Sequence, residues 1–265
     1  MVSVRHKAMG TRFIDDYQVL LLDMGNTFMF GGDRFGDGED YYATYQQAGG
    51  TTLSSEEVHM HITDVFRRML TAARDPSCVD DFGDVARFLR TSETTSGVSM
   101  AEQDLLIKVF SRHEVGTIDD AHVHALHRLR ASHTLGLVSN VWSPSGIFES
   151  ALQEAGVRDL FSVRVWSSDH LSIKPSARLF QKALQGFSIS PERVVYVGDN
   201  PKRDVAGAKA VGMATVWIEN ETRPLMPDMP EPDHVVADLI QLLDEGIQKR
   251  NGRTKECRRR GTPRT

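Results

Sequence analysis

Residues 194–204 read VVYVGDNPKRD, and the fold that we expect starts from this stretch. The run VVYV is short and apolar, which is typical of a strand buried in a parallel sheet. The run is followed by Gly198 and Asp199, and Asp204 comes after four further residues. A carboxylate therefore stands at the end of the predicted strand, and a second one stands at the start of the helix predicted by KRDVAGAKAVG.

Two other stretches end in the same way. LLLDMGNT, at residues 20–27, places Asp23 after an apolar run, and LGLVSN, at residues 135–140, places Asn140 after another. The carboxyl ends of parallel strands meet at one edge of a sheet, and open α/β sheets bind ligands at that edge. We therefore expect Asp23, Asn140 and Asp199 to converge.

The second half of the chain, from about residue 122, alternates helical patterns with short apolar runs. This alternation predicts an α/β fold with a parallel sheet and right-handed crossovers. One predicted helix is strongly marked, with Ser143 as N-cap, Pro144 at its first position and Gly156 just past its end. The last segment, VVADLIQLLDEGIQ at residues 235–248, also predicts a helix.

Between the first two strands lies a block with apolar residues at helical spacings and no convincing strand. Ser54 and Ser99 are its expected N-caps. Glycines at positions 31, 32, 36 and 38 mark a turn-rich entrance to the block. The expected organisation is a Rossmann-like core over 17–35 and 114–248, a helical insert over 36–113, and flexible ends at 1–16 and 249–265.

Composition indicates an ordinary globular protein, with 265 residues of which 40% are hydrophobic. No apolar stretch approaches the ~20 residues of a membrane span, and the N-terminus lacks the apolar region of a signal peptide. The two cysteines, Cys78 and Cys257, are far apart and form no CxxC motif. We expect a cytoplasmic protein without a membrane partner. The sequence leaves its oligomeric state open.

The formal net charge of -5 hides a basic tail. Residues 249–265 contain eight Lys and Arg against the single acidic residue Glu256. Gly, Thr and Pro in this tail favour a solvated, disordered end. Weak binding by this tail is the only nucleic-acid contact that we expect.

Four motifs follow one another along the chain: LLLDMGNT, LGLVSN, Lys174 with Pro175, and VVYVGDNPKRD. Their order and spacing resemble those of the haloacid dehalogenase-like hydrolase superfamily. The resemblance covers nearly the whole chain except its two ends. It is most specific over residues 167–213, where SSDHLSIKPSARLF and VYVGDNPKRDVAGAKAVGM follow the third and fourth motifs of the family. It implies a Rossmann-like core with a helical C1 cap, here the insert over residues 36–113, which closes over the site and selects the substrate.

The resemblance also implies the roles of single residues. Asp23 occupies the position of the nucleophile, where a carboxylate attacks phosphorus and forms an aspartyl-phosphate. Lys174, just before Pro175, would neutralise the nucleophile and the phosphate, and Ser139 with Asn140 would hold phosphate oxygens. The implied Mg²⁺ ligands are carboxylate and carbonyl oxygens, as this cation prefers: Asp23, the carbonyl of Gly25, Asp199 and Asp204.

This chain departs from most phosphatases of the family at Gly25, where they carry a second Asp that protonates the leaving oxygen. Loss of a general acid/base typically costs about 10²–10⁴-fold in rate. Asp33, Arg34 and Asp37, in the sequence GGDRFGDGED, are candidates to replace that acid or to grip an anionic substrate. Charged residues of turns are more often simply solvated.

The sequence thus predicts a Mg²⁺-dependent hydrolase of a small phosphorylated metabolite. One alternative is a catalytically weakened relative that binds a phosphorylated ligand or partner, which Gly25 supports. Another is a phosphonate or haloacid hydrolase. The acidic pair Asp199 and Asp204 argues against the haloacid branch, and Lys108, the single lysine of the insert, is expected at the surface rather than as the Schiff-base lysine of a phosphonatase.

Overall fold

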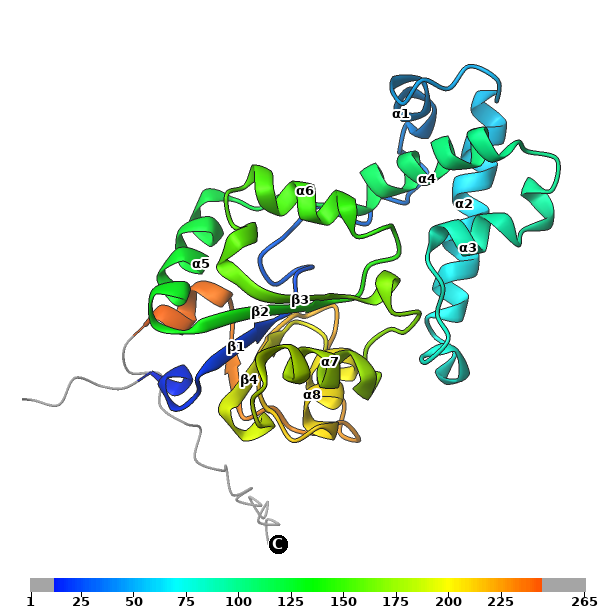
Figure 1. Ribbon diagram of the computed structural model, residues 1–265. Coiled ribbons are helices and arrows are strands. Elements are labelled where there is room, and N and C mark those ends of the chain that lie inside the picture. Colours follow the sequence, from blue (N-terminus) through cyan, green and yellow to red (C-terminus); the bar gives the residue numbers. More distant parts are fainter. Residues whose placement is uncertain (1–11, 245–265) are drawn as a thin grey trace, which may run out of the picture.

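The computed structural model describes residues 12–244 and contains one six-stranded sheet in the order β3-β2-β1-β4-β5-β6. All five neighbouring pairs are parallel, which confirms the predicted α/β fold. Figure 1 shows the sheet with helices on both faces. The strands are β1 (Val19–Leu22), β2 (Thr134–Ser139), β3 (Phe161–Trp166), β4 (Val194–Gly198), β5 (Ala214–Ile218) and β6 (His234–Val236).

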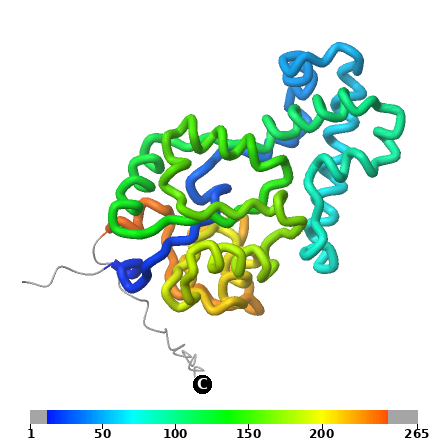
Figure 2. Tube along the Cα trace, in the orientation of Figure 1, coloured from blue at the N-terminus to red at the C-terminus, as the bar shows by residue number. Residues whose placement is uncertain are grey.

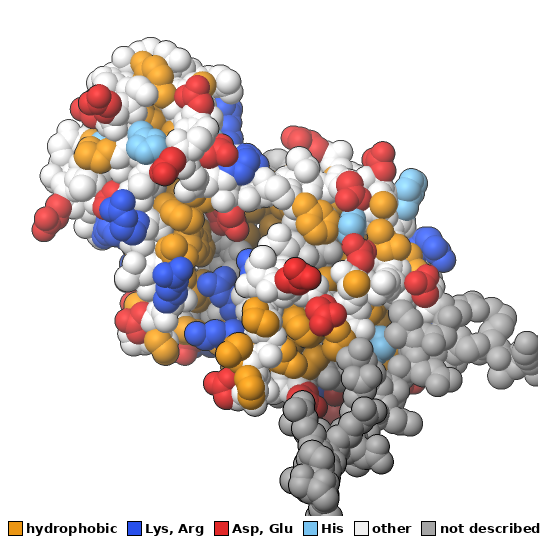
Figure 3. Space-filling view, turned by 180° about the vertical axis from the view of Figure 1, so that it is seen from behind, with side chains coloured by type: hydrophobic (Ala, Val, Ile, Leu, Met, Phe, Trp, Pro, Cys, Tyr) orange, Lys and Arg blue, Asp and Glu red, His pale blue; other side chains and the backbone are white. Residues whose placement is uncertain are grey.

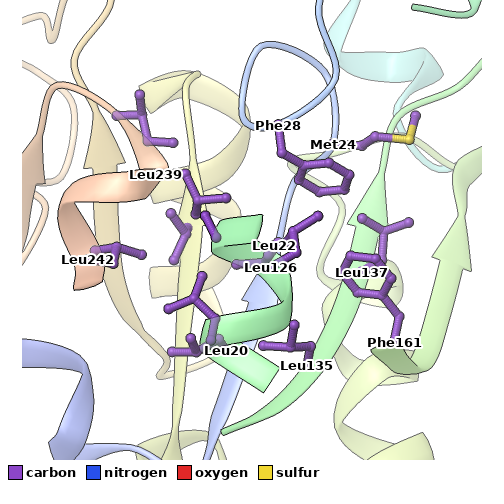
Figure 4. Packing of buried hydrophobic residues seen from close by; sticks show 14 of the residues in the cluster. Leu20, Leu22, Met24, Phe28, Leu126, Leu135, Leu137, Phe161, Leu239 and Leu242 are labelled. Atoms are coloured by element: carbon purple, nitrogen blue, oxygen red, sulfur yellow. The ribbon is translucent and has the colours of Figure 1, made fainter. Parts of the chain in front are cut away.

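The central strand β1 is apolar at every position because both faces of the sheet are covered. Leu20 and Leu22 point into one cluster, with α5 (Asp120–Ser132) and α6 (Gly146–Glu154), as Figure 4 shows in part. The alternate residues of β1 belong to a second cluster, which is formed with α7 (Ala177–Phe187) and α8 (Ala206–Ala210). Successive side chains of β1 therefore point to opposite faces of the sheet and pack into two different hydrophobic clusters.

A lobe of four helices stands to one side of the sheet (Figures 1 and 2). Ser54 caps the second of these helices through a capping box with Glu57, and Ser99 caps the fourth, so both predicted N-caps are confirmed. The lobe has its own hydrophobic cluster. Its helices are α1 (Tyr41–Gln47), α2 (Ser55–Ala72), α3 (Val85–Arg90) and α4 (Met100–Glu114).

Two antiparallel chain segments connect the lobe to the sheet. Phe30 and Thr117 exchange backbone hydrogen bonds of 2.8 Å, and the N–H of Asp33 donates to the carbonyl of Glu114 at 3.1 Å. The guanidinium of Arg34 donates to three carbonyls, those of Gly31, Arg112 and Val115. These bonds hold the connecting segments together as one unit.

The lobe also packs against loops of the sheet region. Trp142, in the loop after β2, packs against Phe66 and Phe82 of the lobe with ring centroids 5.8 and 6.0 Å away. Viewed from behind, hydrophobic and basic side chains gather where the lobe adjoins the rest of the molecule (Figure 3). The lobe therefore contacts the loops at the carboxyl end of the sheet.

The structure corrects two predictions about helices. The segment predicted as a final helix forms the edge strand β6 and a 3₁₀ helix, Leu239–Leu243, because its apolar residues pair with β5 and then cover the sheet. Residues 245–248 of that prediction lie outside the described part. Helix α6 begins later than expected, with Ser145 rather than Ser143 as N-cap, and the hydroxyl of Ser143 accepts no N–H from the described residues.

The N-terminal prediction also needs correction for the residues that are described. Residues 13–16 form a 3₁₀ helix, and Phe13 and Ile14 are buried in the core, so this part is not a flexible lead-in. Residues 1–11 of that segment and the basic tail at 249–265 lie outside the described residues. Across residues 12–244, no helix has the length and apolar character needed to cross a membrane.

Candidate active site

The carboxyl ends of β1, β2 and β4 bring together the predicted site residues. Asp23 directly follows β1, Ser139 ends β2, and Asp199 directly follows β4. The N–H of Asp23 donates to the carbonyl of Val197 at 2.8 Å, which fixes the start of the loop after β1. The predicted convergence is confirmed.

Lys174 lies at the centre of this convergence, and its side chain is only 2% exposed. Its ammonium donates to Asp23 Oδ1 at 2.6 Å, to Asp204 Oδ1 at 2.7 Å and to the Tyr196 hydroxyl at 2.9 Å. Burial alone would lower the pKa of Lys174, but Asp204 and Asp23 raise it above its ordinary value. The site thus holds a permanent buried cation beside Asp23.

Ser139 and Asn140 organise the same corner of the site. The hydroxyl of Ser139 donates to Asp23 Oδ1 at 3.2 Å. The side chain of Asn140 instead bridges the backbone of Lys174, accepting from its N–H at 2.7 Å and donating to its carbonyl at 3.4 Å. Asn140 therefore fixes the loop that presents Lys174.

Three carboxylates, those of Asp23, Asp199 and Asp204, lie with one oxygen each within 4.8 Å of one another. Burial, together with Asp23 and Asp204, raises the pKa of Asp199 to about 7. The Oδ1 atom of Asp199 is buried without a hydrogen-bond partner among the described residues. A cluster of hard oxygen donors with an unsatisfied buried oxygen fits a divalent cation such as Mg²⁺.

Asp204 also has a structural role. Its Oδ2 accepts from the N–H of Asn200 at 2.9 Å, while its Oδ1 faces Lys174. The helical turn that contains it, Pro201–Val205, is capped by Asn200 and not by Asp204. Asp204 thus ties the fourth motif to Lys174.

Two adjoining cavities open over these residues. The larger has a volume of about 230 Å³ and the smaller about 70 Å³. The smaller cavity contains Asp23 and Lys174, and the larger extends toward Met29 and Phe148. The residues lining both cavities are Gly25, Asn26, Asp33, Ser139, Asn140 and Arg223.

Two arginines that sequence reasoning missed lie at the smaller cavity. Arg223, in the loop after β5, pairs with Asp199 Oδ2 at 2.5 Å, and Arg203 lines the wall. Burial lowers the pKa of Arg203, although it stays a cation. Arg203 lies within the GDNPKRD motif, between Asp199 and Asp204, so the sequence could have placed it near the site. Arg223 follows no pattern that would have revealed it.

Glu114, the last residue of α4, is an acid that sequence reasoning also missed. Its two oxygens accept the N–H groups of Trp142 at 2.6 Å and Ser143 at 2.7 Å. Burial, with a smaller contribution from Asp33, raises its pKa to about 7. Glu114 joins the end of the lobe to the loop that carries Asn140.

The structure separates the three candidates at the entrance to the insert. Asp33 lines both cavities. Arg34 is committed to backbone carbonyls of the connecting segments, and Asp37 is exposed and lines neither cavity. A Cβ built on Gly25 would meet no atom within 4 Å, so the space at this position is open.

Comparison with known proteins places this fold, with its aspartates at the carboxyl edge, in a class of hydrolases. Residues 87–218, about half of the chain, match the family model of the haloacid dehalogenase-like hydrolases. The fold is similar to that of the 2-haloacid dehalogenase from Pseudomonas syringae, with a TM-score of 0.60 and 20% identity over 86% of this chain and 96% of that one. The chain is a member of the haloacid dehalogenase-like hydrolase superfamily.

Relatives with higher identity match over shorter stretches. The phosphoserine phosphatase of Thermus thermophilus is 41% identical over 89 residues, which is 34% of this chain and 35% of that protein. The glyceraldehyde 3-phosphate phosphatase of Pyrococcus furiosus is 39% identical over 106 residues, which is 39% of this chain and 44% of that protein. The chain thus spans less than half the length of these two curated relatives.

Proposed function

We propose that the protein is a Mg²⁺-dependent phosphomonoesterase that acts on a small phosphorylated metabolite through an aspartyl-phosphate on Asp23. The observation that carries this proposal is the grouping of Asp23 with Lys174, Asp199 and Asp204 in one buried cluster. A carboxylate held by a cation in a cavity can attack phosphorus, since the cation reduces its repulsion from the phosphate.

In this mechanism Asp23 attacks the phosphorus atom and displaces the alcohol, and water then releases phosphate from the acyl-phosphate. Lys174 neutralises charge on the nucleophile and on the phosphoryl oxygens, while Ser139 and Asn140 position the phosphate. The groups that would hold Mg²⁺ are the carboxylates of Asp23, Asp199 and Asp204 and the carbonyl of Gly25. When bound, the cation would polarise the phosphoryl group and offset its negative charge.

The size of the site and the relatives support the proposed class of substrate. A cavity of about 230 Å³ accommodates a small metabolite. Two relatives are a phosphoserine phosphatase and a glyceraldehyde 3-phosphate phosphatase, and both are named for small phosphorylated metabolites. A magnesium-bound structure of the putative hydrolase YfnB from Bacillus subtilis shares the fold, with a TM-score of 0.54 and 17% identity. In the proposal the insert at residues 36–113 acts as the cap that selects the substrate.

The test is phosphate release from a panel of aryl, sugar and other alkyl phosphates, measured in Mg²⁺ and in a chelator. We expect activity only in Mg²⁺. Asp23→Asn should lower it by about 10³-fold or more, because an amide cannot form the acyl-phosphate. Circular dichroism should show an unchanged fold. Turnover by Asp23→Asn near that of the wild type, or equal rates in chelator, would contradict the proposal.

The open position at Gly25 supports one alternative, a protein that binds a phosphorylated ligand without turning it over. Ligand binding in Mg²⁺ with no phosphate release from any member of the panel would favour it. A phosphonate hydrolase is less well supported, since Lys174 is the only lysine lining either cavity among the described residues, and it is paired with two carboxylates.

A further inference from the structure

Hydrolysis of an alkyl phosphate at this site needs a proton donor. The leaving oxygen becomes an alkoxide unless it is protonated as the bond to phosphorus breaks, and the attacking water must later lose a proton. Lys174 cannot supply that proton, since its ammonium is held by two carboxylates that raise its pKa. The donor must therefore be another group that faces the cavity.

Several carboxyl groups line the two cavities, and most of them are already engaged in other interactions. Asp23 is the nucleophile, and Asp199 and Asp204 are bound to Arg223 and Lys174. The remaining acidic residues that line the cavities, in the part of the chain described, are Asp33 and Glu114.

Glu114 is poorly suited because both of its oxygens accept backbone N–H groups. It also lines only the larger cavity, whereas Asp23 lies in the smaller one. Asp33 is the only acidic residue among those described that lines both. Its carboxylate makes no hydrogen bond to another described residue, and part of the residue is open to solvent, with which it can exchange protons.

The backbone holds Asp33 in place. Its φ of +54° is in the left-handed region, which Asp and Asn tolerate better than most residues. Its N–H donates to the carbonyl of Glu114, and its carbonyl accepts from the N–H of Phe35 at 3.0 Å. The adjacent Arg34 binds three carbonyls of the connecting segments. Asp33 thus stands on an anchored turn and not on a free loop.

We propose that Asp33 is the general acid and base of the reaction, an inference that rests on the proposed phosphatase function. As Asp23 forms its bond to phosphorus and the bond to the leaving oxygen breaks, Asp33 gives its carboxyl proton to that oxygen and the alcohol leaves. Asp33 then takes a proton from the water that attacks the phosphorus of the aspartyl-phosphate. This step restores both the carboxylate of Asp23 and the protonated Asp33, and releases phosphate.

The electrostatic surroundings agree with this role. Desolvation by the surrounding protein raises the pKa of Asp33. Arg223 and Arg203 oppose the shift, and Asp23 adds to it. A raised pKa increases the protonated fraction near neutral pH, which a general acid requires.

The experiment compares Asp33→Asn with Asp37→Asn in the full chain with Mg²⁺, on alkyl phosphates and on an aryl phosphate with a good leaving group. Asn preserves the shape and the backbone preference of Asp33. Asp37→Asn makes the same charge change on the same segment, outside both cavities. We expect Asp33→Asn to lose about 10²–10⁴-fold in kcat/KM on alkyl phosphates and far less on the aryl ester, whose leaving group needs no proton. Asp37→Asn should match the wild type on both.

Two further measurements separate catalysis from structure. The wild-type rate on alkyl phosphates should fall as the pH rises through the raised pKa of Asp33, and this fall should be absent in Asp33→Asn. Adding Gly25→Asp to Asp33→Asn should recover part of the alkyl-phosphate activity, because a side chain at Gly25 enters the same open space.

Equal losses on alkyl and aryl substrates, or no loss on either, would overturn the role of Asp33 while leaving the phosphatase function in place. Absence of any phosphate release by the wild type would overturn the proposed function itself. A matching loss in Asp37→Asn would also overturn the assignment to Asp33, since it would point to the net charge of the segment.

Discussion

Lys174 is the residue whose loss should disturb the site most. It is buried between Asp23 and Asp204, where solvent screens their negative charges poorly. Breaking a buried ion pair by removing one partner leaves an uncompensated charge, which costs more than the intact pair contributes. The site is therefore built around one cation on which two carboxylates depend.

We predict that Lys174→Met lowers kcat by about 10²–10³-fold, because a fixed charge facing the phosphate is lost. The free energy of unfolding should fall by about 3 kcal/mol as Asp23 and Asp204 face each other without their cation. Urea unfolding and phosphate-release kinetics measure the two effects. Lys182→Met, an exposed lysine on α7, serves as the control and should change neither. Wild-type turnover by Lys174→Met would refute the role of the cation.

The sequence predicted the site residues that belong to motifs, but not the residues that surround them. Asp23, Asp199 and Lys174 could be predicted because strand ends and motif order place them. Glu114 and Arg223 could not, since they approach the site from the end of α4 and from the loop after β5, through contacts between segments that are far apart in the chain.

At the scale of elements, the strands and capped helices were predictable because local patterns determine them. Strand β4 contains the predicted run VVYV, and Ser54 and Ser99 cap their helices as expected. The segment after β5 was mispredicted because its apolar spacing fits a helix, while the exposed edge of β5 provides a better partner for residues 234–236. That choice depends on tertiary pairing, which a local pattern does not contain.

Gly32 lies where the two segments that connect the lobe to the sheet approach each other closely. A Cβ at this position would collide with the carbonyl oxygen of Glu114, in the backbone of the opposite segment. We predict that Gly32→Ala destabilises the protein by about 1–3 kcal/mol, because the two connecting segments must separate. Thermal unfolding would measure the change. Gly36→Ala, where a Cβ meets no atom within 4 Å, is the matched control, and equal stability of the two variants would show that the segments tolerate separation.

For the molecule as a whole, metal binding should be visible as stability. A ligand that binds only the folded state stabilises it, by about 2.7 kcal/mol at 100 times its dissociation constant. We predict that saturating Mg²⁺ raises Tm by about 5–10 °C for a protein of this size. Asp199→Asn should abolish the rise, whereas Asp37→Asn should retain it. The same rise in Asp199→Asn, or none in the wild type, would place the ion elsewhere.

The order of strands also affects how the chain finds its fold. Val19, in the central strand, pairs with Thr134 and with Val194, so both of its neighbours are distant in the sequence. Contacts between distant segments must overcome a loop-closure entropy and form slowly compared with local helices. During synthesis, β1 therefore has no strand to pair with until the whole helical lobe and β2 have been made. Rapid folding of the helical lobe would shorten the loop that β1 has to close.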